Sequence, residues 1–180
     1  MSNLQMKSLI DSVCVFISSG FGAGFLPSGL PGRFKRLKIP EHWTGAGFLG
    51  SVMGIIFAWA GFPLTGPKGF LILTTATCLG IWTSGRAEEV LGKKDDPRIV
   101  VDEILGTFWS LFLIPLASYQ DGKKWMVLLA ALVLFRIFDV YKIPSRRVQD
   151  LKGGFGVVLD DVLSGMAVNV ILRSVLRMIR

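Results

Sequence analysis

The chain has 180 residues, of which 51% are hydrophobic and 18% charged, and its formal net charge is +7. This length fits a single domain over residues 1–180, and a mean hydropathy of +0.55 argues against an ordinary soluble protein. The basic residues lie in short loops beside apolar segments and form no nucleic-acid-binding motif, so the partner they indicate is an anionic lipid bilayer and no nucleic acid.

Six apolar segments follow one another along the chain, at 10–26, 45–64, 69–85, 104–118, 125–140 and 157–179. A helix needs about 20 residues to cross a bilayer, and the second and third segments have roughly this length. The segments 104–118 and 125–140 need flanking residues to span. The pattern predicts an all-α fold, namely a helical bundle that forms a multi-pass membrane protein.

The first segment differs from the others because glycine and proline recur from Gly20 to Gly32. These residues disfavour a continuous helix. We therefore predict that residues 10–32 form an interfacial or re-entrant N-terminal segment that ends in a glycine-proline loop.

Lysine and arginine predict the orientation of the bundle. The loops 27–44, 86–103 and 141–156 hold four of these residues each, whereas the loops on the opposite side hold three in total. Because cytoplasmic loops are enriched in lysine and arginine, we expect the three rich loops in the cytoplasm. The acidic clusters lie on the same side. Arginines at the end of the last segment leave open whether it spans or lies along the interface.

Acidic residues gather in polar stretches between the apolar segments. A carboxylate near membrane depth is costly unless it meets a cation, a metal ion or water. We expect one polar metal-binding site built from six carboxylates, Asp96, Asp102, Glu103, Asp139, Asp160 and Asp161. No histidine or cysteine cluster accompanies them, so oxygen ligands favour a hard cation such as Mg²⁺. Purely structural roles, as helix-terminal acids or ion pairs, are the alternative.

Cations and glycines near these acids could bind phosphate oxygens. Arg136, Lys142 and Lys152 supply positive charge, and Gly153 and Gly154 supply backbone amides. Arg136 and Asp139 share one helix face at i and i+3. Together these residues indicate Mg²⁺-assisted chemistry on a phosphorylated amphiphile, without choosing between hydrolysis and transfer.

Four motifs occur in order from about residue 15 to the C-terminus: 20-GFGAGFLP-27 with Pro31-Gly32, 96-DPRIVVDEILG-106, 135-FRIFDVYK-142 and 153-GGFGVVLDDVLSG-165. They resemble the phosphatidylglycerophosphatase A family of bacterial lipid phosphatases. The resemblance implies an all-helical protein of the bacterial cytoplasmic membrane. Such a protein would use Mg²⁺ to hydrolyse phosphatidylglycerophosphate, a membrane phospholipid, to phosphatidylglycerol and phosphate.

The resemblance also implies roles for the polar motif positions. We expect Asp102, Glu103, Asp139 and Asp161 to act in catalysis, with one carboxylate as general base. Arg136 or Lys142 would stabilise charge on the phosphoryl oxygens, at a site that faces the cytoplasm. Attack by water and an aspartyl-phosphate intermediate both remain open.

Two stretches depart from the family pattern. Residues 33–43 interrupt the family's proline-glycine-threonine motif as an insertion, and the link from Lys142 to the glycine pair is shortened. Because both changes lie near the expected headgroup site, a phosphatase for another lipid phosphate is one alternative. A small cation or proton transporter is another, since intramembrane acids also mark ion pathways.

Overall fold

A computed structural model describes residues 3–26, 45–144 and 148–179 of the chain. Within these ranges the protein is all-helical, as predicted, and contains no strand. Its helices are α1 (Asn3–Ser18), α3 (Ala46–Trp59), α4 (Gly66–Leu91), α5 (Val101–Leu111), α6 (Asp121–Tyr141) and α7 (Gly154–Met178). Short 3₁₀ turns η1 (Ala23–Phe25), η4 (Leu116–Ser118) and η5 (Val148–Asp150) lie between them.

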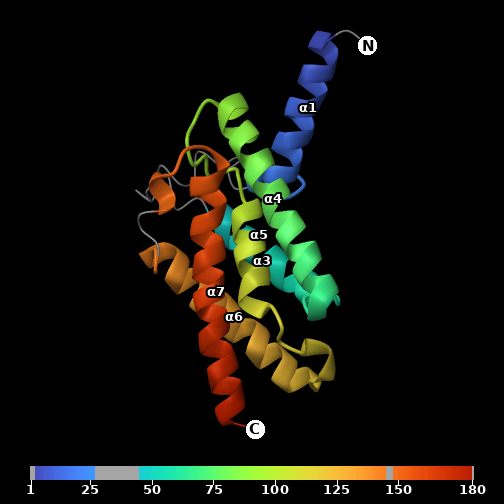
Figure 1. Ribbon diagram of the computed structural model, residues 1–180, viewed down its shortest axis with the longest axis vertical. Coiled ribbons are helices and arrows are strands. Elements are labelled where there is room, and N and C mark those ends of the chain that lie inside the picture. Colours follow the sequence, from blue (N-terminus) through green and yellow to red (C-terminus); the bar gives the residue numbers. More distant parts are fainter. Residues whose placement is uncertain (1–2, 27–44, 145–147, 180) are drawn as a thin grey trace.

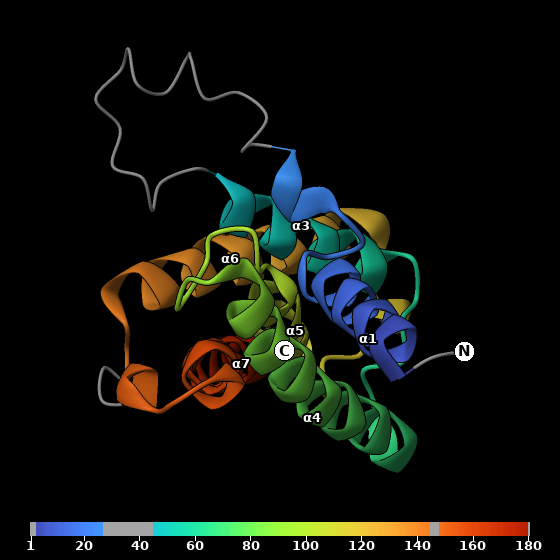
Figure 2. The ribbon, with the colours of Figure 1, turned by 90° about the horizontal axis from the view of Figure 1, so that it is seen from above.

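Helix α5 forms the centre of the bundle. Seen from above, it is surrounded by α3, α4, α6 and α7, while α1 lies outside beside α4 (Figure 2). Nine of its eleven residues are buried, which suits a helix that is apolar on nearly every side. Leu105, Phe108 and Leu111 contribute to the core together with Leu128 of α6 and Val158 of α7.

Glycines bring α5 and α7 into backbone contact. A side chain at Gly165 of α7 would overlap the carbonyl oxygen of Gly106 in α5, so only glycine fits at this crossing. A side chain at Gly106 would overlap both the ring of Phe135 and the carbonyl oxygen of Asp161 in α7. This close approach sets the N-terminal halves of α5 and α7 side by side (Figure 1).

The segment 10–32 is not one continuous helix in its described part, as predicted, because α1 ends at Ser18 and the glycines from Gly20 onward lie in turns and in η1. Its interfacial or re-entrant placement stays a prediction. The segment 104–118 is not one helix, since α5 ends at Leu111, four residues before Pro115, and Leu113 adopts a φ of 60°. The expected glycine-proline loop and the insertion 33–43 fall largely or wholly outside the described residues.

Helix α7 is the one described helix that is long and apolar enough to cross a membrane, by length and composition. Its most apolar stretch has a mean hydropathy of 1.7, yet 61% of that stretch is buried inside the bundle. Helix α3 is apolar but only 14 residues long. The multi-pass arrangement therefore stays a prediction.

Candidate active site

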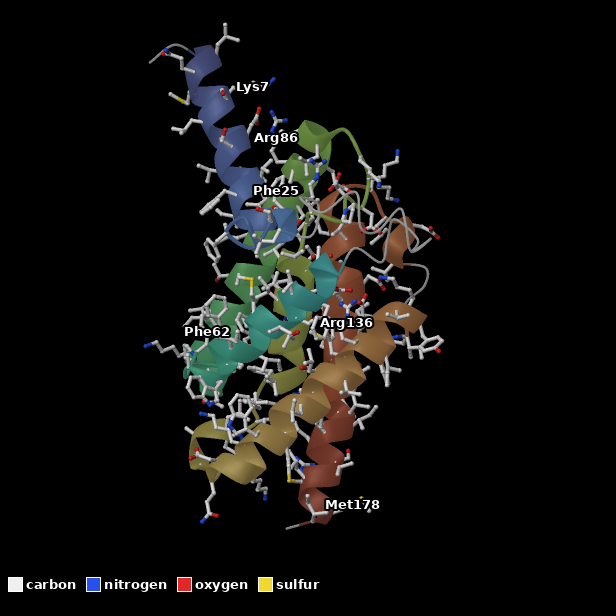
Figure 3. All side chains as sticks on the ribbon, turned by 180° about the vertical axis from the view of Figure 1, so that it is seen from behind. Lys7, Phe25, Phe62, Arg86, Arg136 and Met178 are labelled. Carbon is white, nitrogen blue, oxygen red and sulfur yellow. The ribbon has the colours of Figure 1, made fainter. Side chains whose placement is uncertain are left out.

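A cavity of about 1140 Å³ lies where the N-terminal ends of α3, α5 and α7 meet the C-terminal end of α6. Arg136, labelled in Figure 3, projects from α6 at this junction. Among the described residues, the charged side chains of the wall are eight carboxylates and four cations: Asp95, Asp96, Asp102, Glu103, Asp139, Asp150, Asp160 and Asp161, with Lys93, Lys94, Arg136 and Lys142. This described part of the wall is therefore acidic.

Three carboxylates form the inner part of this wall. Asp102 and Glu103 lie in the first turn of α5, as predicted, and Asp161 faces them from α7. One oxygen atom from each lies within 4.8 Å of the other two. One oxygen of each carboxylate, Asp102 Oδ1, Glu103 Oε2 and Asp161 Oδ2, is buried and has no hydrogen-bond partner among the described residues. Buried, unpartnered acceptors this close together could hold a cation.

The electrostatics of the three carboxylates support the same interpretation. Burial raises the pKa of Asp102 well above its ordinary value, and the charges of Glu103 and Asp161 raise it further. A bound divalent cation would reverse this effect and favour the ionised form. The described residues that line the cavity include no cysteine or histidine, so the donors are hard oxygen atoms that suit Mg²⁺.

Two cations of α6 hold the remaining carboxylates of the inner wall. Lys142 Nζ lies 2.7 Å from Asp160 Oδ2 and 3.2 Å from Asp139 Oδ1. Arg136 Nη1 lies 2.8 Å from Asp139 Oδ2, which is the predicted i,i+3 pair. Burial alone would lower the pKa of Lys142, but the charges of Asp161, Asp139 and Asp160 outweigh it and raise that pKa, so the ammonium stays charged.

The adjacent acids Asp160 and Asp161 point to different partners. Asp160 contacts Lys142 of α6, whereas Asp161 faces the carboxylates of α5.

Asp96 lies in the cavity wall but apart from the three-carboxylate group. Arg98 donates hydrogen bonds from Nε to Asp96 Oδ1 and from Nη2 to Asp96 Oδ2, each at 2.7 Å. Burial alone would raise the pKa of Asp96, but these hydrogen bonds outweigh it and hold the pKa below its ordinary value. Both oxygens of Asp96 therefore contact the guanidinium of Arg98, and a metal-binding role for Asp96 stays a prediction.

Lys152, Gly153 and Gly154, which were predicted to bind phosphate, do not belong to the described lining of the cavity. Lys152 is exposed and does not belong to the described lining of the cavity. Gly153 caps α7 with a φ of 63°, and a side chain at Gly154 would overlap the backbone of Ile81 in α4. The glycine pair therefore places the start of α7 against α4, and Gly156 is the glycine of this motif that reaches the cavity.

Sequence reasoning missed the contribution of α3. A side chain at Gly47 would overlap Glu103 Oε1, so the absence of one leaves room for that carboxylate. Ser51, one turn later, accepts a hydrogen bond from Arg136 Nη1 at 3.3 Å. Nothing in the sequence spacing of Ser51 and Arg136 indicated this contact.

The described residues thus form an all-helical bundle with a cavity lined mainly by carboxylates. The family model of phosphatidylglycerophosphatase A matches residues 16–176, and the chain belongs to this family. The resemblance of the four motifs is thereby confirmed, and the protein is a lipid phosphatase. The family match and the chain's relatives do not support the alternative of a cation or proton transporter.

Curated relatives are similar over most of their lengths. Phosphatidylglycerophosphatase A of Haemophilus influenzae is 34% identical over 167 residues, which cover 91% of this chain and 88% of the relative. Phosphatidylglycerophosphatase A of Escherichia coli is 27% identical over 152 residues, which cover 83% of this chain and 76% of the relative. A Bacteroides thetaiotaomicron protein named "Putative phosphatidylinositol-3-phosphatase" is 34% identical over 154 residues, which cover 84% of this chain and 86% of the relative. No solved structure gives a significant match.

Proposed function

We propose that the protein hydrolyses the terminal phosphomonoester of phosphatidylglycerophosphate in a Mg²⁺-dependent step of phospholipid biosynthesis. The products are phosphatidylglycerol and inorganic phosphate. The family and the names of two relatives support this substrate. The observation that carries the metal dependence is the group of three buried carboxylates with unpartnered oxygens, Asp102, Glu103 and Asp161.

The negative charges of the cavity wall and of the substrate would repel each other unless a cation lies between them. The described part of the cavity wall has twice as many carboxylates as cationic side chains, eight against four. A phosphomonoester carries a charge of about −2 near neutral pH, so an acidic cavity would repel it. Asp102, Glu103 and Asp161 would hold Mg²⁺, which when bound neutralises phosphoryl charge and makes a water molecule more acidic.

The residues around the cation would bind the phosphate and accept a proton during hydrolysis. Arg136 and Lys142 bind phosphoryl oxygens and stabilise the charge that builds up on them. A carboxylate outside the metal-holding group, Asp139 or Asp160, accepts the proton of the attacking water. The water oxygen forms the new bond to phosphorus, the bond to the glycerol oxygen breaks, and that oxygen takes up the proton that the carboxylate accepted from the water. Both carboxylates contact Lys142, which holds them at the cavity.

The outer surface of the bundle supports a membrane location. Met126 and Leu129 on α6 are 69% and 55% exposed, and Leu71 and Leu79 on α4 are 67% and 54% exposed. Large apolar side chains in this number on outward helix faces suit contact with lipid better than contact with water. We therefore propose a multi-pass bundle in the bacterial cytoplasmic membrane, with the cavity on the cytoplasmic side, where lysine and arginine are enriched.

A second substrate class has one specific observation in its favour. The Bacteroides relative is named for a phosphoinositide 3-phosphate activity. Release of inorganic phosphate by purified protein in detergent separates the two. We expect phosphatidylglycerophosphate to be hydrolysed with the highest kcat/KM when compared with phosphatidylinositol 3-phosphate and phosphatidic acid, each with and without Mg²⁺. A higher value for another lipid would replace the proposed substrate.

A further inference from the structure

Ser51 contacts the site from outside the cavity. Its side chain is fully buried, with 0% exposure, and it does not belong to the described lining of the cavity. Its hydroxyl donates a hydrogen bond to the carbonyl oxygen of Gly47 at 3.0 Å. That bond uses the only proton of the hydroxyl group, so Oγ faces Arg136 as an acceptor and takes a hydrogen bond from Nη1 at 3.3 Å.

Arg136 is held on one nitrogen only. The ion pair with Asp139 at 2.8 Å and the hydrogen bond to Ser51 both use Nη1. Among the described residues, neither Nη2 nor Nε of Arg136 makes a hydrogen bond. A guanidinium recognises phosphate by presenting two N–H groups in one plane. The free edge of Arg136 therefore suits a phosphoryl oxygen pair, provided that the plane of the guanidinium is fixed.

Asp139 alone is a poor support for that plane, because it also contacts Lys142. Ser51 supplies a second support from a different helix, α3, and it is rigidly held within its own turn. We propose that Ser51 is a positioning residue, which fixes the guanidinium of Arg136 so that Nη2 and Nε face the phosphate of the substrate. The inference rests on the proposed function, because it requires a phosphate in this cavity.

A double-mutant cycle tests the inference. The variants are Ser51→Ala, Arg136→Gln and the pair, in full-length protein purified in detergent. The measured quantities are kcat/KM for phosphatidylglycerophosphate and the dissociation constant of inorganic phosphate with Mg²⁺ by calorimetry, which needs no turnover. We expect Ser51→Ala to weaken phosphate binding and lower kcat/KM about tenfold when Arg136 is present. In the Arg136→Gln background the same change should alter phosphate binding by no more than about twofold.

Ser110→Ala is the matched control. Ser110 is also fully buried and donates to a backbone carbonyl of its own helix, Thr107 O, but among the described residues its hydroxyl accepts no hydrogen bond from Arg136. This variant should lose thermal stability without losing phosphate affinity.

The outcomes separate the two proposals. If wild-type protein neither binds phosphate nor hydrolyses the lipid, the proposed function fails and this inference with it. If wild-type protein is active and Ser51→Ala is equally harmful with and without Arg136, or harmless in both, the function stands and the positioning role is wrong.

Discussion

Gly47→Ala adds one methyl group at the boundary between α3 and the active site. The new Cβ would overlap Glu103 Oε1, lie 3.1 Å from Glu103 Cδ and lie 3.3 Å from Arg136 Nη1. Carbon atoms at van der Waals contact are about 3.5–4.0 Å apart, so the carboxylate of Glu103 has to move by about 1 Å. Because the obstacle is the end of a flexible side chain, the backbone can stay where it is.

The displacement should cost activity without costing stability. A shift of about 1 Å in a catalytic geometry lowers the rate by about 100-fold, and we expect this loss in kcat/KM. Folding should be unchanged or slightly favoured, since alanine is better than glycine inside a helix by up to about 1 kcal/mol. The half-saturating Mg²⁺ concentration should rise, because Glu103 belongs to the proposed metal-holding group.

The assay is release of inorganic phosphate per folded molecule over a series of Mg²⁺ concentrations, with thermal stability measured in the same detergent. Gly122→Ala is the control, since Gly122 is also the second residue of its helix and a Cβ there would meet nothing within 4 Å. This control should keep wild-type activity. Wild-type kcat/KM and Mg²⁺ dependence in Gly47→Ala would refute the placement of Glu103 in the site.

Three further predictions concern charge, packing and orientation. Glu103→Gln and Asp161→Asn keep the side-chain volume but remove the negative charge, so phosphate release should fall by at least about 100-fold while the folded fraction stays normal; near-wild-type turnover would rule out a metal-holding role. Gly165→Ala forces a methyl group into the backbone of α5, so it should destabilise the protein by about 1–3 kcal/mol or more, measured as a lower melting temperature; an unchanged value would contradict the helix crossing. Cysteines introduced at Lys93 and Lys123 should show opposite labelling by an impermeant thiol reagent on intact cells, with only position 123 labelled; the reverse pattern would overturn the proposed orientation.

Local features of the site could be predicted from the sequence because they depend on helical spacing alone. The first-turn position of Asp102 and Glu103 followed from the start of an apolar segment, and the structure confirms it. The pairing of Arg136 with Asp139 followed from their separation of three residues. The bundle itself followed from apolar segments long enough to form helices.

Features that depend on contacts between helices could not be predicted in this way. The sequence places six carboxylates in three polar stretches, but only the crossing of α5 and α7 at Gly106 and Gly165 brings Asp161 to the first turn of α5. Gly154 resembled part of a phosphate-binding loop, although its tight packing is against the backbone of α4. The partner of Asp96, Arg98, lay only two residues away, but a pair at this spacing has no helical rule to predict it.

The most direct test of the metal site is phosphate release from phosphatidylglycerophosphate by the purified protein after treatment with excess EDTA. The three buried carboxylates repel one another and the phosphate when no cation is bound. We therefore expect release to stop in EDTA and to return when Mg²⁺ is added beyond the chelator. Unchanged release in excess EDTA would contradict a Mg²⁺-dependent reaction at Asp102, Glu103 and Asp161.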